Sequence, residues 1–154
     1  MKEAFDKYDT PILAKWGDDI ALGGYGSGWT AIPSALIRNI GNLKLTGTDF
    51  AVLSVVLSYW WDADKPPTPR AGGIARMLDV TPRTVERSLK KMTELGLMKR
   101  NKGRYGGAID LSPLVAKVTE LAIHDLHYIS EVRRLREEER IQLIAAEFDD
   151  DEPH

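Results

Sequence analysis

The most informative stretch of the chain is residues 74–97, which read IARMLDVTPRTVERSLKKMTELGL. Asp79 and Val80 interrupt its helical pattern with a tight turn. Thr81 and Pro82 follow as a helix cap and a proline suited to the first helical position. Apolar residues then recur at spacings of three or four, at Val85, Leu89, Met92 and Leu95. Gly96 suits the position just past a helix end, so the stretch predicts two short helices joined by a tight turn, a helix-turn-helix.

An apolar helix is predicted before this motif, over residues 50–61. Residues 46–49 read TGTD and offer hydroxyl and carboxylate caps for its start. The proline pair at 66–67 stops it, because proline cannot continue a helix. Apolar side chains occupy several of its faces, which indicates that this helix lies at the centre of the core.

A small β-hairpin is predicted after the motif. Residues 97–100 and 108–111 have the composition of short strands, and the basic, glycine-rich residues 101–107 form the turn between them. A hairpin in this position is called a wing. The sequence therefore predicts a mainly α fold with a small β-wing, a winged helix-turn-helix, followed by a long C-terminal helix.

The long helix is predicted from residue 113 to residue 148, because no helix breaker follows Pro113. A 3/4 apolar spacing runs through Leu114, Val118, Leu121, Tyr128, Val132 and Leu135, and Asp125 interrupts it. This stripe exceeds what one small domain needs to bury, which favours dimerisation. The alternative is that the helix folds back on its own core.

Basic residues concentrate in the helix-turn-helix and the wing. Residues 68–107 contain ten Lys and Arg against three Asp and Glu, a surplus of seven positive charges. The rest of the chain contains eleven against twenty, so the formal net charge of −2 hides a strong asymmetry. A basic block inside an acidic chain is typical of a site for a polyanion.

Composition argues against an enzyme. The 154 residues include no cysteine, which removes disulfides, zinc fingers and a Cys nucleophile. The glycine-rich residues 23–28 lack the spacing of a phosphate loop. His124 and His127 lack an evident third metal ligand, and no Ser/His/Asp or paired-carboxylate arrangement is visible. We expect no enzymatic activity, no metal and no cofactor.

The chain shows no sign of membrane targeting. Its N-terminus has no apolar core of a signal peptide, and its longest apolar stretch is far shorter than the roughly 20 residues of a membrane helix. The sequence therefore predicts a soluble, cytoplasmic protein with no membrane partner.

Residues 74–97 resemble the winged helix-turn-helix of bacterial and phage DNA-binding proteins, and the helix at 45–61 fits the same family. The stretch IDLSPL at 109–114 resembles the amino-terminal domains of plasmid and phage replication initiators. The resemblance covers about residues 29–115. It implies DNA binding without reaction chemistry.

This family resemblance and the charge together give a division of the chain. Residues 1–28 are an N-terminal extension and residues 29–112 a winged helix-turn-helix DNA-binding domain. Residues 113–148 are the C-terminal helix for dimerisation, and residues 149–154 an acidic tail.

The expected DNA contacts lie on the outer face of helix 82–95 and on the wing. A major groove about 12 Å wide admits one helix, and arginine can pair with guanine through two hydrogen bonds. The expected base readers are Arg83, Thr84 and Arg87, with Ser88 on the same face. The expected phosphate and wing contacts are Lys90, Lys91, Lys99, Lys102, Arg104 and Tyr105. Glu86 also lies on this helix, and the sequence leaves open an ion pair between it and Arg83 or Lys90 as an alternative to DNA contact by those residues.

The function predicted from these residues is sequence-specific binding of double-stranded DNA by a homodimeric transcriptional regulator. One alternative is a plasmid or phage replication initiator, which would bind origin repeats and contact replication machinery. Another is a winged-helix module that binds protein. The sequence leaves these alternatives open.

Overall fold

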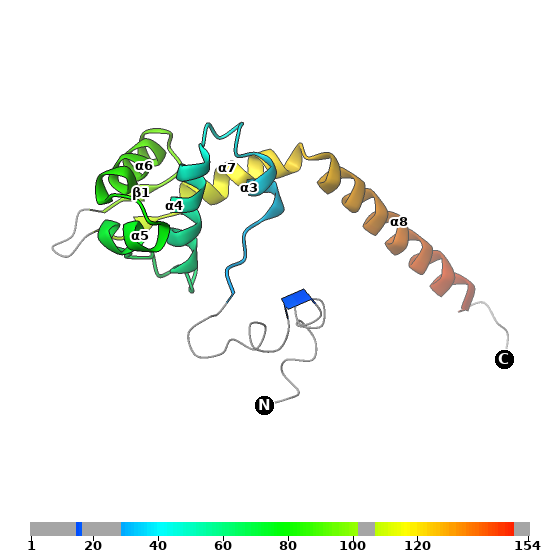
Figure 1. Cartoon of the computed structure of the whole chain (residues 1–154). Coiled ribbons are helices and arrows are strands. Elements are labelled where there is room, and N and C mark those ends of the chain that lie inside the picture. The colour runs from blue at the N-terminus through cyan, green and yellow to red at the C-terminus, as the bar shows by residue number, and fades with distance from the viewer. Residues whose placement is uncertain (1–14, 17–28, 102–106, 150–154) are drawn as a thin grey trace, which may run out of the picture.

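The computed structural model describes residues 15–16, 29–101 and 107–149 (Figure 1). Its elements are the helices α3 (Ser34–Arg38), α4 (Gly47–Ser58), α5 (Ala71–Leu78) and α6 (Pro82–Glu94), the strands β1 (Lys99–Arg100) and β2 (Ile109–Asp110), and the helices α7 (Ser112–Ile123) and α8 (Leu126–Asp149). The fold is mainly helical with one small antiparallel sheet, so the predicted winged helix-turn-helix is confirmed.

Helix α4 begins at the predicted cap. The Thr46 side chain accepts a hydrogen bond from the Asp49 amide, and the Asp49 carboxylate accepts one from the Thr46 amide, which makes a complete capping box. Val52, Leu53 and Val56 are fully buried along the helix. Helix α4 packs against both α5 and α6, so it is the centre of the core as predicted.

The turn between α5 and α6 follows from two local features. Asp79 ends α5 in the left-handed region with φ 52°, which turns the chain sharply. Thr81 then caps α6 and Pro82 occupies its first turn, as the sequence predicted. Val85, Leu89 and Met92 of α6 are buried, but Leu95 ends the helix and is 40% exposed, so the buried apolar stripe stops at Met92.

The wing forms by antiparallel pairing of β1 with β2, with Lys99 opposite Asp110 and Arg100 opposite Ile109. The Ile109 amide donates to the Pro67 carbonyl at 2.9 Å, so the segment before α5 lies along the other edge of β2. Leu97 and Met98 are buried beneath the hairpin and fix it to the core. Residues 102–106, the tip of the wing, lie outside the described residues.

The prediction of one helix over residues 113–148 is wrong, because the chain forms two helices there. Helix α7 ends at Ile123 with His124 as its cap, and the Asp125 carbonyl accepts a hydrogen bond from the Ile129 amide in the first turn of α8. Arg38 of α3 donates to the Asp125 carboxylate at 2.9 Å and ties this junction to the domain. The interruption at Asp125 in the apolar spacing thus marks a helix boundary.

The two helices have different surroundings. Leu114 and Val118 of α7 are buried in the core, and α7 packs against α3. Each buried side chain of this size contributes about 1.5–3 kcal/mol, enough to hold α7 to its own domain. Figure 1 shows α8 running away from the rest of the described chain. Helix α7 therefore folds back on the core of its own domain, and α8 is the helix of this region that remains for dimerisation.

None of the helices within the described residues is long and apolar enough to cross a membrane. The acidic residues after Asp149 and most of the N-terminal extension lie outside the described part of the chain.

Candidate nucleic-acid interface

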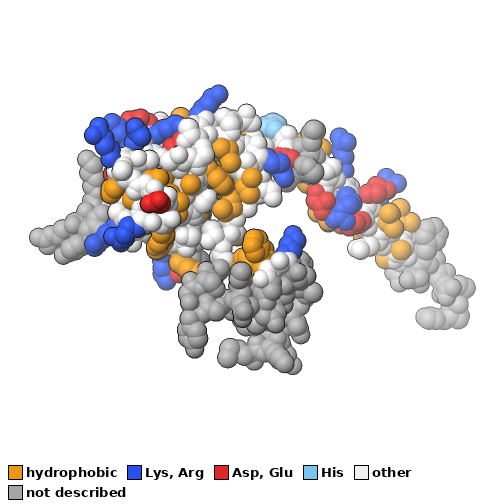
Figure 2. Space-filling view, in the orientation of Figure 1, with side chains coloured by type: hydrophobic (Ala, Val, Ile, Leu, Met, Phe, Trp, Pro, Cys, Tyr) orange, Lys and Arg blue, Asp and Glu red, His pale blue; other side chains and the backbone are white. Residues whose placement is uncertain are grey.

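The exposed face of α6 carries three long basic side chains, Arg83, Arg87 and Lys90. Figure 2 shows Lys and Arg side chains gathered over this helix, at the upper left of the view. Within the described residues, Arg83 and Arg87 form no ion pair. The Lys90 amine lies 3.9 Å from the Glu94 carboxylate, which is a loose contact on the surface. All three are available to an anion outside the chain.

Thr84 lies in the first turn of α6 and is half-buried. Its amide donates to the Thr81 hydroxyl at 3.2 Å, and the two hydroxyl oxygens are 3.0 Å apart. This cap orders the start of α6, where unpaired amides and the helix dipole favour a negative charge. Thr84 therefore lies at the correct end of the helix for a base or phosphate contact, but its hydroxyl already has a partner.

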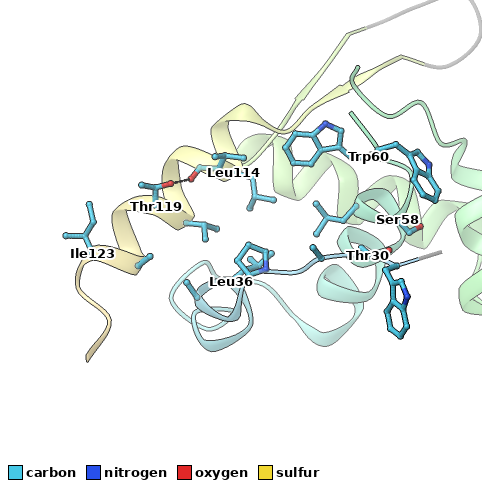
Figure 3. A pocket seen from close by; sticks show the side chains of 16 residues that line it. Thr30, Leu36, Ser58, Trp60, Leu114, Thr119 and Ile123 are labelled. Carbon is cyan, nitrogen blue, oxygen red and sulfur yellow. Dashed lines mark hydrogen bonds between the residues drawn. The ribbon is translucent and has the colours of Figure 1, made fainter. Parts of the chain in front are cut away.

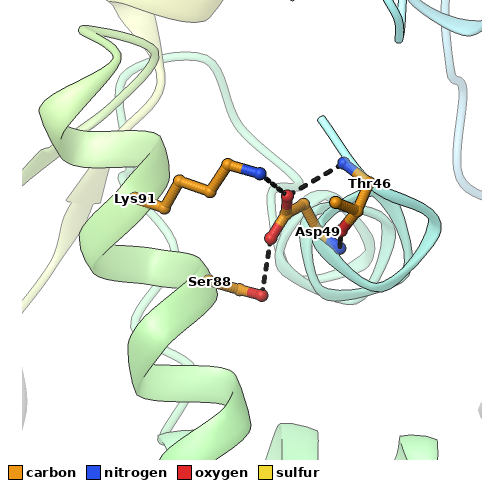
Figure 4. Close-up of polar contacts among 4 residues, drawn as sticks. All are labelled: Thr46, Asp49, Ser88 and Lys91. Atoms are coloured by element: carbon orange, nitrogen blue, oxygen red, sulfur yellow. Dashed lines mark hydrogen bonds and ion pairs between the residues drawn. The ribbon is translucent and has the colours of Figure 1, made fainter. Parts of the chain in front are cut away.

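Ser88 and Lys91 turn toward α4 rather than toward solvent (Figure 4). The Ser88 hydroxyl donates to the Asp49 carboxylate at 2.8 Å, and the Lys91 amine donates to the other carboxylate oxygen at 2.5 Å. Ser88 is only 5% exposed, so the prediction that it lies on the outer face is wrong. The Lys91 side chain is 38% exposed, but its charge is directed to Asp49.

Asp49 is the anchor between α4 and α6. It is 3% exposed, and both of its carboxylate oxygens are engaged by α6 or by the Thr46 amide. Burial by itself would raise the pKa of Asp49, but the hydrogen bonds from Lys91, Thr46 and Ser88 outweigh burial and lower the pKa to about 2. The ionised carboxylate thus fixes the orientation of α6, and with it the direction in which Arg83 and Arg87 point.

Arg100 and Glu86 join α6 to the wing. The Arg100 guanidinium donates to both carboxylate oxygens of Glu86, at 2.9 and 3.4 Å. The partner of Glu86 is thus Arg100 rather than Arg83 or Lys90. This forked contact spans a groove between α6 and the wing, whose lining residues are Arg83, Glu86, Arg87, Lys90, Thr93, Glu94, Arg100, Asn101 and Gly107.

Lys99 is exposed on β1, opposite Asp110. The Ser112 hydroxyl and amide both donate to the Asp110 carboxylate, and these bonds keep the pKa of Asp110 below its usual value, with Lys99 adding a smaller attraction. The Lys99 amine is therefore still free to contact a phosphate. The other expected wing contacts, Lys102, Arg104 and Tyr105, lie outside the described residues.

Sequence reasoning left out two basic residues, Arg70 and Arg76. Both are exposed, Arg70 at the start of α5 and Arg76 in its last turn, and neither forms an ion pair with any residue that the structure describes. In helix-turn-helix complexes the first helix crosses the DNA backbone, so these two side chains are suited to phosphate contacts. Both belong to the basic block of residues 68–107, and this could have identified them as candidate phosphate contacts from the sequence.

The region around His124 does not form a metal site in the described part of the chain. No group of three or more His, Asp or Glu side chains lies close enough together there to hold an ion.

The sequence matches no protein-family model, and no curated protein is significantly similar to it. Among solved structures, the chain is similar to a crystal structure of MarR. The identity is 21%, and the match covers 74% of this chain and 86% of that chain with a TM-score of 0.36.

Proposed function

We propose that the protein binds double-stranded DNA in a sequence-specific manner, with α6 in the major groove and the wing on the flanking backbone. The observation that supports this most is the exposed pair Arg83 and Arg87 on a helix that Asp49 holds from behind. Anchored in this way, α6 presents both guanidinium groups outward in a fixed direction, beside the other basic residues of the helix-turn-helix.

The geometry of α6 fits base contacts by these two side chains. Arg83 and Arg87 are four residues apart, so they project from one side of the helix about 6 Å from each other along its axis. Each guanidinium can donate two hydrogen bonds to guanine O6 and N7. Thr84 contributes at the same end of the helix, where its position suits a base or a phosphate.

The remaining basic residues suit the phosphate backbone. Lys90 lies further along α6. On one side of the groove, we expect the DNA backbone to be contacted by Lys99 and the wing residues Lys102, Arg104 and Tyr105. On the other side of the groove, the backbone would be contacted by Arg70 and Arg76. Phosphate contacts fix position and orientation but carry no sequence information, so the specificity would come from Arg83, Arg87 and Thr84.

A transcriptional regulator is the role we propose for this DNA binding, with a site that overlaps a promoter. Neither the comparisons nor the described contacts favour a replication initiator or an interaction with replication machinery.

Selection from a random pool of DNA duplexes tests the proposed function. We expect sequencing of the bound fraction at several salt concentrations to reveal one enriched motif. We also expect the logarithm of the affinity to fall linearly with the logarithm of salt concentration, because each phosphate contact releases counterions. Absence of binding at low salt would contradict the proposal and favour a module that binds protein.

We further propose that the protein is a homodimer joined through the end of α8. Ile141 and Ile144 are 58% and 42% exposed and lie on one side of the helix, about 60° apart around its axis. An isolated helix is marginally stable in water, so a second copy would supply the packing that α8 lacks here. Such a dimer would bind two half-sites about one turn of DNA apart, or a multiple of it.

Substitution of Ile141 and Ile144 together by aspartate is expected to convert the dimer to a monomer, because the two charges would be buried at the interface. Light scattering at high micromolar concentration measures the mass. Leu95→Asp is the matched control, since Leu95 is also exposed but lies at the end of α6 rather than on α8. A monomer mass for the wild-type protein at that concentration would refute the dimer.

A further inference from the structure

A large apolar pocket lies outside α6 and the wing. It forms where the segment before α3 meets the end of α4 and the outer side of α7, and its volume is about 660 Å³ (Figure 3). Its floor is made of core side chains, among them Leu36, Leu57 and Leu114. Figure 3 shows Trp60 and Leu114 on one side of the space and Leu36 on the other.

The size of this pocket is that of a ligand site. Pockets for small molecules measure roughly 300–1,000 Å³, and protein interiors otherwise leave few voids larger than a water molecule. Val52, Leu53 and Val56 of the adjoining core are fully buried, whereas Trp61 and Ile123 of the pocket lining are 74% and 52% exposed, so the pocket opens to solvent. The space is therefore distinct from the ordinary gaps of a packed domain.

The chemistry of the lining selects an uncharged molecule. No ionisable side chain is found among the described residues that line the pocket. Ser58 and Thr119 bring hydroxyls to it, but these donate to the Val55 and Val115 carbonyls of their own helices, at 2.6 and 2.8 Å. Thr30 adds an exposed hydroxyl, but a charged ligand would still lose hydration here without gaining an oppositely charged partner, so it should bind more weakly.

Aromatic side chains form a large part of the rim. Trp60 is half-buried in the wall, whereas Trp29 and Trp61 are 41% and 74% exposed at the edge. Trp29 already packs edge-to-face against Trp16, with ring centroids 6.3 Å apart, whereas the half-buried Trp60 and the exposed Trp61 offer flat faces against which a ring can stack. From the volume, the absence of charge and these faces, we propose that the pocket binds a small, uncharged molecule of largely aromatic or hydrocarbon character.

The uncharged dye N-phenyl-1-naphthylamine tests this site in the full-length protein. Its anionic relative 1-anilinonaphthalene-8-sulfonate has the same ring systems with an added sulfonate. We expect saturable binding of the uncharged dye to one site, with quenching of tryptophan emission because three of the lining residues are Trp. The anionic dye should bind at least about tenfold more weakly, a difference of about 1.4 kcal/mol.

A variant that fills the pocket locates the binding. Ala122 lines the pocket from α7, so Ala122→Phe places a ring in the space and should weaken binding of the uncharged dye at least about tenfold. Glu120→Phe is the control, because Glu120 is an exposed residue of the same helix that lines neither this pocket nor the smaller hollow beside it, and it should leave binding unchanged. The uncharged dye at saturation should also raise the unfolding temperature of the wild-type protein, because it binds only the folded state.

Three results would overturn the proposal. The first is no saturable binding of the uncharged dye up to its solubility limit, including the case in which Trp16→Ala restores binding because the chain's own N-terminal residues fill the space. The second is equal binding by the anionic dye. The third is unchanged binding, and an unchanged rise in unfolding temperature, in a folded Ala122→Phe variant. None of these results bears on DNA binding, because no residue of α6 or the wing lines the pocket.

Discussion

Replacement of Arg83 and Arg87 together by alanine is expected to remove most of the preference of the protein for its target sequence. Each arginine that pairs with a guanine through two hydrogen bonds contributes about 1–3 kcal/mol of discrimination against the wrong base. Loss of both therefore costs about 2–6 kcal/mol in the ratio of specific to non-specific affinity. Both side chains are exposed and unpaired within the described residues, so the fold should tolerate the change.

The measurement compares affinities for the selected duplex and for a scrambled duplex at one salt concentration. Arg133→Ala with Arg136→Ala is the matched control, because these two arginines of α8 are also exposed and form no ion pair with described residues. The control removes the same charge but should keep the specificity ratio. An unchanged ratio in the Arg83 and Arg87 variant would mean that α6 does not contact the bases.

Substitution of Asp49 is expected to have the largest effect on stability. In Asp49→Ala the Ser88 hydroxyl loses its partner in the interior, the Lys91 charge loses its counterion, and the capping box of α4 is broken. We expect a loss of about 2–4 kcal/mol in the free energy of unfolding, since hydrogen bonds to a charged group are worth about 1.5–3 kcal/mol each and Lys91 can partly rehydrate. Urea unfolding monitored by circular dichroism measures this loss.

The pH dependence of the free energy of unfolding distinguishes the effect of the Asp49 charge from the effect of its side-chain shape. Its pKa is about 2 in the folded protein against an ordinary value of 3.8, so ionisation favours the folded state. The resulting stability is fully present above about pH 4 and is lost as the pH falls toward 2. Nearly two pKa units correspond to about 2 kcal/mol.

Asp49→Asn provides the comparison, because the amide has the shape of the carboxylate but does not titrate. The difference in unfolding free energy between the wild type and Asp49→Asn should shrink by about 2 kcal/mol between pH 5 and pH 2. A difference that stays constant over this range would show that the Asp49 carboxylate is not held as an ion by Lys91 and Ser88.

The helix-turn-helix could be predicted from sequence because local signals define it. The caps at Thr46 and Thr81, the proline at 82 and the glycine at 96 each act within one or two turns of the chain, and each lies where it was expected. The apolar spacing of α6 was equally local. These signals fixed both the order of the elements and the exposed positions of Arg83 and Arg87.

The errors arose where a side chain pairs with a distant part of the chain. Ser88 was assigned to the outer face by its spacing, but its partner Asp49 is 39 residues earlier, and no local pattern indicates that contact. The pairing of Glu86 with Arg100 across 14 residues was missed for the same reason. Leu95 fits the apolar spacing, but the helix ends there and the side chain faces outward.

The C-terminal region shows a different limit. Residues 113–148 contain no proline or glycine after the start, so the pattern could not show that the chain turns at His124 and Asp125. The contact between Arg38 and Asp125, which are 87 residues apart in the sequence, holds this junction against α3. The assignment of Leu114 and Val118 to a dimer stripe was ambiguous in the sequence, because a helix that packs on its own core has the same spacing.

Methylation interference measures which groove of the DNA α6 enters. Dimethyl sulfate methylates guanine N7 in the major groove and adenine N3 in the minor groove, so each modification blocks contact in one groove. We expect N7 methylation at guanines of the selected motif to abolish binding, because Arg83 and Arg87 would lose an acceptor there. Binding that tolerates N7 methylation throughout the motif would contradict the placement of α6 in the major groove.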